Sequence, residues 1–465
     1  MKYLTVDFGS TYTKLTAIDA GSKTILGTSG AFTTIDTNVM DGFNVALQNL
    51  EEKTGKFYYD QLLCCSSAAG GLKMVALGLV PELTAKAARL AASSAGAKVV
   101  KTYSFEISKA EQDEIYDINP DLVLLCGGTD GGNKEVIIAN ARRLSAISCN
   151  FTIIVAGNKS ASYDIEDIFR NSQKDYVIAD NVMPVFNKLN IAPAKKCITD
   201  LFIKKIIEVK GLSVIQNMSS NEVIPTPLAV MNACELLSKG TKNTPGIGEL
   251  LAIDLGGATT DVYSMSSGKP HGENIIERGL PEPFSKRSVE GDIGMRYSLS
   301  SLAEQIDTDN LPEKEILQKW VKQCVQSPDI IAEEAEEFIA EELLARCAVE
   351  IAVERHCGIL ESSYSPMGEI FTLTGKDLTE TPYVIGIGGA IINSRNPVSI
   401  LQGAKYNPKK YNYMKPRNPK YLIDKKYIFA SMGLLSTVDP ELALWLMYKE
   451  LKELKIESGE LKVNG

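Results

Sequence analysis

The chain has 465 residues, of which 44% are hydrophobic and 23% charged, and its formal net charge at pH 7 is −9. This length predicts about two to four folding units, and the composition is ordinary for a globular protein. An acidic chain has no general attraction to nucleic acid or to an anionic membrane surface, so we expect neither as a partner.

The ends and the cysteine content set further limits. The N-terminal sequence MKYLTVDFGS lacks the apolar region and cleavage site of a signal peptide, and no run of about 18 uncharged apolar residues predicts a membrane-spanning helix. Nine scattered cysteines without a C-x-x-C pair favour free thiols in a reducing cytoplasm. Two histidines, His271 and His356, argue against histidine-based metal sites and Ser-His-Asp chemistry.

Short apolar runs open the chain. The segments 3–8 and 13–19 predict a β-hairpin with a small-residue turn. The next expected elements are a strand within 24–36, a helix at 42–53 and a buried strand at 61–67.

A different rhythm follows the break AAGG at 68–71. An Ala-rich helix is expected at 82–95. Apolar strands then alternate with helices, and we predict strands at 121–128, 151–157 and 175–180 and helices at 133–146 and 160–171. This alternation predicts a parallel, three-layer subdomain.

The second half of the chain begins at 250–264, which repeats the opening pattern. A Glu/Ala-rich segment at 330–356 predicts a solvated amphipathic helix, and strands are expected at 371–375 and at the start of 383–392. Segment 404–427 is interpreted as surface, and a last helix is expected at about 440–454. We therefore divide the chain into residues 1–75 (first part of an N-terminal half), 76–230 (inserted subdomain and return to that half), 231–400 (C-terminal half) and 401–465 (extension).

An internal echo carries the chemistry. V-D-F-G-S-T-Y-T-K at 6–14 and I-D-L-G-G-A-T-T-D-V at 253–262 each place Asp at the end of a strand and small residues in the turn after it. Backbone N–H groups of such turns can approach a phosphate closely. The candidate phosphate-binding residues are Gly9, Ser10, Thr11, Thr13 and Lys14 in the first turn and Gly256, Gly257, Ala258, Thr259 and Thr260 in the second.

The aspartates have a separate expected role. Asp7 and Asp254 would hold Mg²⁺, often through water, because this ion gives up its hydration shell reluctantly. Asp254 and Asp261 are the candidate catalytic carboxylates. The alternative is that Asp7 and Asp254 only end their strands and cap turns, and Lys14 is either a phosphate contact or an exposed strand lysine.

The third feature is G-I-G-G-A at 386–390, which ends a strand just before a helix. Gly388, Gly389 and Ala390 would let the backbone lie flat against adenosine. A structural strand-to-helix turn is the alternative. One Gly-rich turn is weak evidence, whereas three turns in this order and spacing are specific.

These three segments resemble the phosphate-1, phosphate-2 and adenosine motifs of the acetate and sugar kinase/Hsp70/actin superfamily. That resemblance implies an α/β fold of two ribonuclease H-like halves around a nucleotide cleft, with ATP and Mg²⁺ as ligands. More narrowly, the chain resembles the MutL (GlmL) family in DFGSTYTK (7–14), LCCSSAAGGLKM (63–74), DLVLLCGGTDGGN (121–133), IDLGGATTDVYS (253–264), SVEGDIGMR (288–296) and VIGIGGAI (384–391).

That family is encoded beside adenosylcobalamin-dependent glutamate mutase and related aminomutases. The resemblance implies an ATP-dependent reactivating factor that releases damaged cobalamin from a mutase, with the mutase subunits as partners and slow ATP hydrolysis coupled to domain closure. The inserted subdomain lacks the D-x-H-x-x-G motif of base-off cobalamin domains, so we do not expect it to bind cobalamin in that mode. A flavodoxin-like shape would let it mimic the small subunit of the mutase.

Three other functions stay open at this point. A small-molecule kinase would use Asp261 or Asp292 as its base. An activator of radical acyl-CoA dehydratases would bridge a [4Fe–4S] cluster through cysteines, a pattern that Cys347 and Cys357 match poorly. An actin-like filament is the weakest reading. The sequence leaves open which mutase is the partner and whether the protein is a homodimer.

Overall fold

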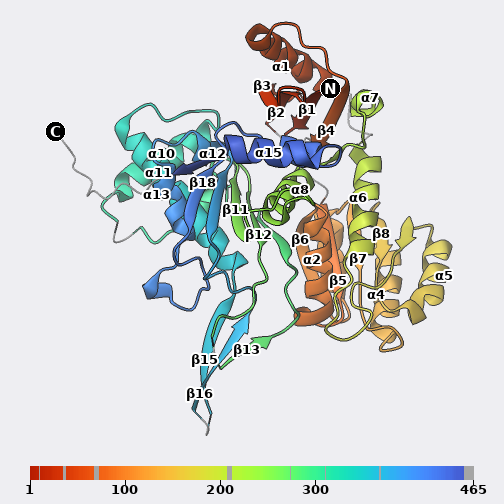
Figure 1. Ribbon diagram of the computed structural model, residues 1–465. Coiled ribbons are helices and arrows are strands. Elements are labelled where there is room, and N and C mark those ends of the chain that lie inside the picture. The colour runs from red at the N-terminus through yellow and green to blue at the C-terminus, as the bar shows by residue number, and fades with distance from the viewer. Residues whose placement is uncertain are drawn as a thin grey trace.

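The computed structural model describes residues 1–9, 11–34, 38–67, 73–206, 212–272, 274–308, 311–365 and 368–454 (Figure 1). Ser10 and the break at 68–71 lie outside these residues. Within the described ranges, no helix combines the length and apolar character needed to cross a membrane.

The first half is built on a five-stranded sheet in the order β3-β2-β1-β4-β10. Three antiparallel strands are followed by two parallel ones. Its elements are β1 (Lys2–Phe8), β2 (Tyr12–Asp19), β3 (Thr24–Phe32), α1 (Val39–Thr54), β4 (Gln61–Ser66), β10 (Ile224–Pro225) and α8 (Thr226–Lys239). Sequence analysis predicted β1, β2, β3, β4 and α1 correctly and missed β10 and α8.

The second half repeats this arrangement in a six-stranded sheet, β14-β12-β11-β17-β18-β19. Renumbered from its first strand, the order is again 3-2-1-4-5, with β19 added antiparallel at the edge. Its elements are β11 (Leu250–Leu255), β12 (Thr260–Met265), β14 (Ser285–Glu290), α9 (Leu299–Glu304), α10 (Lys314–Gln326), α11 (Ala335–His356), β17 (Tyr383–Ile387), α12 (Gly389–Ile392), α13 (Pro397–Leu401), β18 (Lys420–Ile423), α14 (Phe429–Leu435), α15 (Pro440–Glu450) and β19 (Lys452–Leu454). The two ribonuclease H-like halves confirm the predicted fold class.

Strand alternation decides which side chains face the junction between the halves. In β1, Leu4, Val6 and Phe8 join the core beneath α1, and the residues between them point to the other face. In β11, Leu251, Ile253 and Leu255 likewise pack beneath α11. Asp7 and Asp254 fall on the opposite faces, which cover a shared core with α8 and α14. Both strand-end aspartates therefore point toward the junction.

A third sheet is inserted between β4 and β10. It is all parallel, in the order β6-β5-β7-β8-β9, which is the flavodoxin-like order 2-1-3-4-5. Its elements are β5 (Lys73–Gly78), a π-helical turn (Pro81–Ala85), α2 (Lys86–Ser94), β6 (Lys98–Ser104), α3 (Lys109–Ile118), β7 (Leu122–Leu125), α4 (Glu135–Ser145), β8 (Thr152–Val155), α5 (Ser162–Ser172) and β9 (Tyr176–Ile178). Two helices, α6 (Ala192–Ile206) and α7 (Leu212–Met218), lead back to the first half.

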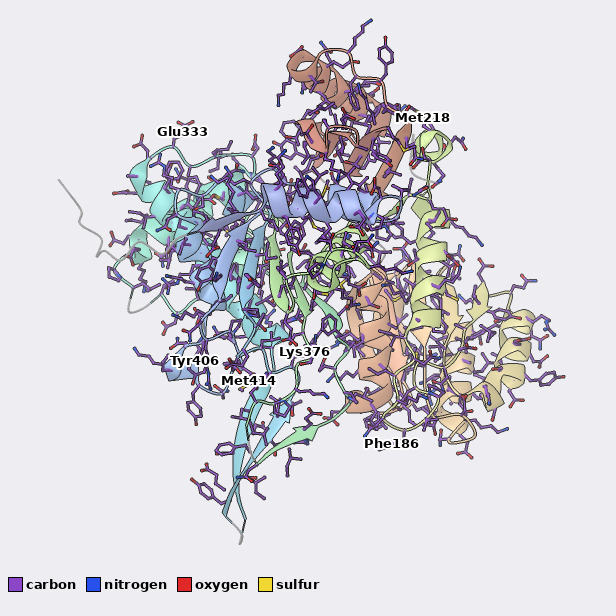
Figure 2. All side chains as sticks on the ribbon, in the orientation of Figure 1. Phe186, Met218, Glu333, Lys376, Tyr406 and Met414 are labelled. Carbon is purple, nitrogen blue, oxygen red and sulfur yellow. The ribbon has the colours of Figure 1, made fainter. Side chains whose placement is uncertain are left out.

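A small sheet, β13-β16-β15, projects from the second half at the bottom of Figure 1. Its strands are β13 (Ile275–Arg278), β15 (Ile359–Ser365) and β16 (Gly368–Thr374). Lys376, which follows β16 and is labelled in Figure 2, is fully buried and donates to the carbonyl oxygens of Ser266 and Phe284. Burial lowers the pKa of Lys376 to about 7.

Two sequence expectations need correction. Segment 404–427 is not all surface, because it contains β18, whose Tyr421 and Ile423 are buried in the second sheet. The Glu/Ala-rich helix begins at Ala335, and its Ala, Leu and Val residues from 340 to 353 pack into the core beneath that sheet. The apolar stretch of β18 is short and is surrounded by Lys, Tyr and Asn, so the sequence pattern did not predict a strand there. The many Glu residues of α11 suggested a solvated helix, although its other face is buried.

The halves are joined by α8 and α14, which cross at very close range. A Cβ atom added to Gly433 of α14 would lie 1.7 Å from the carbonyl oxygen of Ala229 in α8. We expect Gly433→Ala to force the helices apart and lower the free energy of unfolding by about 2 kcal/mol or more. Urea unfolding monitored by circular dichroism measures this effect. An unchanged unfolding midpoint would contradict the close crossing.

Candidate functional site

The two hairpins place their polar residues at equivalent positions. On β1, Asp7 is the register partner of Lys14 on β2. On β11, Asp254 is the register partner of Asp261 on β12. Each pair is separated by seven residues, so the echo seen in the sequence is also an echo in space. The first hairpin therefore pairs an acid with a base, whereas the second pairs two acids.

Asp7 is held from the first residue of α8. The hydroxyl of Thr226 donates to Asp7 Oδ1 at 2.6 Å, and the thiol of Cys65 donates to the same oxygen at 3.5 Å. Asp7 is only 5% exposed. Thr226 was missed by sequence analysis, because a Thr beside a Pro reads as an ordinary helix start. Cys65, expected to be core, is buried.

The turns after the two aspartates each contain an equivalent backbone hydrogen bond. The N–H of Gly9 donates to the carbonyl of Tyr12, and the N–H of Gly256 donates to the carbonyl of Thr259, each at 3.0 Å. A Cβ atom at Gly9 would lie 2.6 Å from the Tyr12 oxygen. The first turn therefore requires a residue without a side chain at Gly9.

Segment 293–298 braces the second turn from one side. The carbonyl of Gly256 accepts from the N–H of Met295, and that of Gly257 accepts from the N–H groups of Arg296 and Tyr297. Ser298 donates its hydroxyl to the carbonyl of Ala258. Three successive carbonyls of the turn are therefore hydrogen-bonded on this side.

Two predicted phosphate contacts have other partners. The hydroxyl of Thr13 lies 3.0 Å from that of Thr33, and the hydroxyl of Thr260 donates to the carbonyl of Ile293. Both residues are fully buried. Thr11 is exposed in its turn, and Thr259 donates weakly to Asp261 Oδ2 at 3.4 Å. The structure thus brings Thr11 and Thr259 to the turn surface and leaves Thr13 and Thr260 beneath it.

The third predicted turn touches the second aspartate directly. Gly388 has φ +92°, and a Cβ atom there would lie 2.4 Å from the carbonyl oxygen of Leu255 and 2.8 Å from Asp254 Oδ1. Gly389 begins α12, and a Cβ atom there would meet only Asn393, at 3.7 Å. Ala390 packs against the core of the second half. The glycine turn and Asp254 therefore form one surface.

Burial and mutual repulsion shape the charges here. Desolvation and the nearby Asp261 raise the pKa of Asp254 to about 7, against the opposing effect of Lys14. Desolvation also lowers the pKa of Lys14, whose ammonium lies 3.3 Å from the ring centre of Tyr427. The ammonium of Lys14 therefore lies among the carboxylates of Asp7, Asp254 and Asp424.

A further carboxylate was missed by sequence analysis. Asp424 follows β18 and accepts from the N–H groups of Ile428 and Phe429 at the start of α14. Burial raises the pKa of Asp424 to about 6. It occupies the place in the second half that Thr226 occupies in the first, at the end of the fifth strand. Predicting Asp424 as a site residue would have required recognising β18 as a strand.

Two carboxylates considered as catalytic bases are bound by arginines. Arg287 contacts Asp261 Oδ1 through Nε at 2.7 Å and Nη2 at 2.6 Å. Arg355 binds both oxygens of Asp292, at 2.8 and 3.0 Å, and also pairs with Glu290. The Arg355 guanidinium holds the pKa of Asp292 below its usual range.

The loop 127–133 is internally satisfied. The buried side chain of Asn158 bonds to the backbone of Gly131, Gly132 and Asn133. The side chain of Asn133 accepts from the N–H of Val136 in the first turn of α4. These contacts account for the loop as a connection that leads into α4.

Among the described residues, no three or more His, Cys, Asp or Glu side chains form a group that could hold a metal ion. An apolar cavity of about 410 Å³ lies among α9, α10 and α11, and none of the motif residues lines it.

The model of the MutL protein family matches residues 3–451. Protein MutL of Clostridium tetanomorphum is 45% identical over 459 residues, which cover 97% of this chain and 99% of that protein. Similar solved structures include gluconate kinase from Lactobacillus acidophilus (10% identity, 98% and 92% coverage, TM-score 0.35) and xylulose kinase from Bifidobacterium adolescentis (12% identity, 99% and 97% coverage, TM-score 0.34).

Proposed function

The chain belongs to the MutL family, and from this premise we propose that it is an ATP-binding switch protein that reactivates an adenosylcobalamin-dependent mutase, either glutamate mutase or a related aminomutase. One observation carries the nucleotide part of this proposal. Asp7 and Asp254 end equivalent strands in two equivalent halves, and the glycine turn at Gly388 touches the second of them.

The residues suit Mg²⁺ and ATP in distinct ways. One or two carboxylates, with waters and phosphate oxygens, are the usual ligands of Mg²⁺, and Asp7 and Asp254 would supply them. The ion would offset the charge of the phosphates. The turns at Gly9 and Gly256 would donate backbone N–H groups to phosphate oxygens. Adenosine would lie beside Gly389, where an added Cβ atom would meet only Asn393, at 3.7 Å.

The switching part of the proposal depends on the junction. Both halves meet at the crossing of α8 and α14, and Thr226 and Asp424 connect the starts of these helices to the cleft. A nucleotide that contacts both hairpins would bind a closed arrangement more tightly than an open one. Its arrival and hydrolysis would therefore change the angle between the halves.

The partner part of the proposal depends on the inserted sheet and on family membership. The flavodoxin-like order of that sheet supports mimicry of a mutase small subunit. His356 is unsuited to cobalamin, because it is buried between the hydroxyls of Ser264 and Ser288. Desolvation also holds the pKa of His356 well below its usual range.

The other functions have less support. A kinase base must accept a proton from a substrate hydroxyl, and both candidates, Asp261 and Asp292, are bound by arginines. A cluster-bridging activator needs thiolates, and burial raises the pKa of Cys347 to about 11 and that of Cys357 to about 12.

Calorimetry with Mg·ATP tests the clamp. We expect the wild-type protein to bind Mg·ATP and Asp7→Ala to bind it at least about tenfold more weakly, a loss of about 1.4 kcal/mol, because one carboxylate next to the ion is removed. Asp41→Ala is the matched control, since Asp41 is exposed on α1. No binding by the wild type would overturn the nucleotide proposal.

ATP hydrolysis stimulated by a small hydroxylated substrate, and not by mutase subunits, would favour a kinase.

A further inference from the structure

Helix α2 of the inserted sheet is contacted at both ends by the second half. At its first residue, Lys86 forms an ion pair of 2.6 Å with Glu282, which also pairs with Lys286. At its last turn, Arg287 Nη1 donates to the carbonyl oxygens of Ser93 and Ala97, at 3.0 and 3.4 Å. The second half therefore contacts α2 through charged side chains at both ends.

The same Arg287 guanidinium binds Asp261. On the paired strands β12 and β14, Tyr263 is the register partner of Arg287, which places Asp261 one diagonal step away. Arg287 therefore uses Nε and Nη2 for the carboxylate and Nη1 for the helix. Only 5% of this residue is exposed. A planar guanidinium suits this double contact, which an ammonium group cannot reproduce.

The two contacts depend on each other. The carbonyl end of a helix carries partial negative charge, so α2 and Asp261 are two anionic partners of one cation. A buried arginine cannot lose one partner without cost, because an unpaired buried charge is strongly unfavourable. A shift of the Asp261 carboxylate must therefore change how Arg287 holds the last turn of α2.

Asp261 is also coupled to the nucleotide cleft. It is the register partner of Asp254 on the neighbouring strand, so the two carboxylates lie next to each other on one face of the sheet, where like charges repel. A cation placed at Asp254 would replace this repulsion with attraction for both carboxylates. One carboxylate, that of Asp261, and one guanidinium, that of Arg287, therefore connect Asp254 to the last turn of α2.

We infer that Arg287 is a positioning residue that transmits the occupancy of the nucleotide cleft to the inserted flavodoxin-like sheet, through Asp261 on one side and the last turn of α2 on the other. This inference rests on the proposed function, because it requires Mg·ATP to bind at Asp254. It assigns the inserted sheet as the part of the protein whose behaviour reports the nucleotide state.

Hydrogen exchange of the amides in residues 86–97 tests the coupling, with calorimetry on the same samples. In the wild type, saturating Mg·ATP should change exchange in this segment about fivefold or more, the lower range of ordinary coupling. Arg287→Lys keeps the positive charge but cannot hold both partners, so it should still bind Mg·ATP while the response of 86–97 falls below about twofold.

The control is Arg355→Lys, which removes the same kind of double contact, to Asp292 and Glu290, in the same half. It should keep the wild-type response of residues 86–97. Wild-type protein that binds Mg·ATP without a change in this segment would overturn the coupling alone. Wild-type protein that does not bind would overturn the nucleotide proposal and the coupling together. An Arg287→Lys response equal to that of the wild type would also overturn the coupling. If this variant does not fold, calorimetry and hydrogen exchange of the wild type with Mg·ATP still test the coupling.

Discussion

Replacing Asp254 with asparagine should make the protein more stable at pH 8 and should weaken the proposed binding of Mg·ATP. Desolvation and Asp261 raise the pKa of Asp254 to about 7 in the folded protein, whereas an unfolded aspartate has a pKa of about 3.9. The folded state therefore binds more protons between these values, so this residue lowers stability as pH rises from about 4 to 7. The loss persists above pH 7.

The expected gain follows from that difference. A rise in pKa from about 4 to about 7 corresponds to at most about 4 kcal/mol. We expect about 2 kcal/mol in practice, because Asp254 is partly exposed and water screens its charge. Asparagine keeps the shape of the side chain and cannot carry the charge that attracts Mg²⁺.

Urea unfolding at several pH values distinguishes this effect from a change in packing. The stability difference between Asp254→Asn and the wild type should be largest at pH 8, shrink near pH 5.5 and vanish near pH 3, where the aspartate is largely protonated in both states. Calorimetry at pH 8 should detect a loss of Mg·ATP affinity of at least about tenfold, about 1.4 kcal/mol. A variant that is less stable than the wild type at pH 8 would contradict the explanation.

The central part of the site could be predicted from the sequence. Asp7 and Asp254 were found because each ends an apolar strand and precedes a glycine turn, a local pattern that needs no knowledge of distant residues. Chain order alone then indicated that the two hairpins belong to two similar halves. The sheet orders confirm this. The short distance between Gly388 and Asp254 was not predicted from the sequence.

The residues that were missed share a different property. Thr226 lies 219 positions from Asp7, and Arg287 reaches Ser93 across 194 positions. Neither has a local signal, since an isolated Arg or Thr on a strand or helix end is common on any surface. Asp424 depended on β18, a four-residue strand surrounded by Lys, Tyr and Asn. These residues reach the site through contacts between distant parts of the chain, which the pattern of a single sequence does not reveal.

Gly388 and Gly389 should respond to the same substitution in opposite ways. Alanine at 388 requires φ +92° and places Cβ 2.4 Å from the carbonyl oxygen of Leu255. A strained left-handed residue and an overpacked contact each cost about 1–3 kcal/mol. We therefore expect Gly388→Ala to lower the free energy of unfolding by about 3 kcal/mol and to displace Asp254, so that Mg·ATP binding is lost with stability.

Alanine at 389 meets only Asn393 at 3.7 Å and starts a helix, where it is a better residue than glycine. The fold of Gly389→Ala should be as stable as that of the wild type. If adenosine lies flat on this backbone, the added methyl group should weaken Mg·ATP binding about tenfold or more, or 1.4 kcal/mol. Thermal unfolding without nucleotide and calorimetry with it separate the two effects. Full binding by a stable Gly389→Ala would show that Gly389 serves only the turn and that adenosine lies elsewhere.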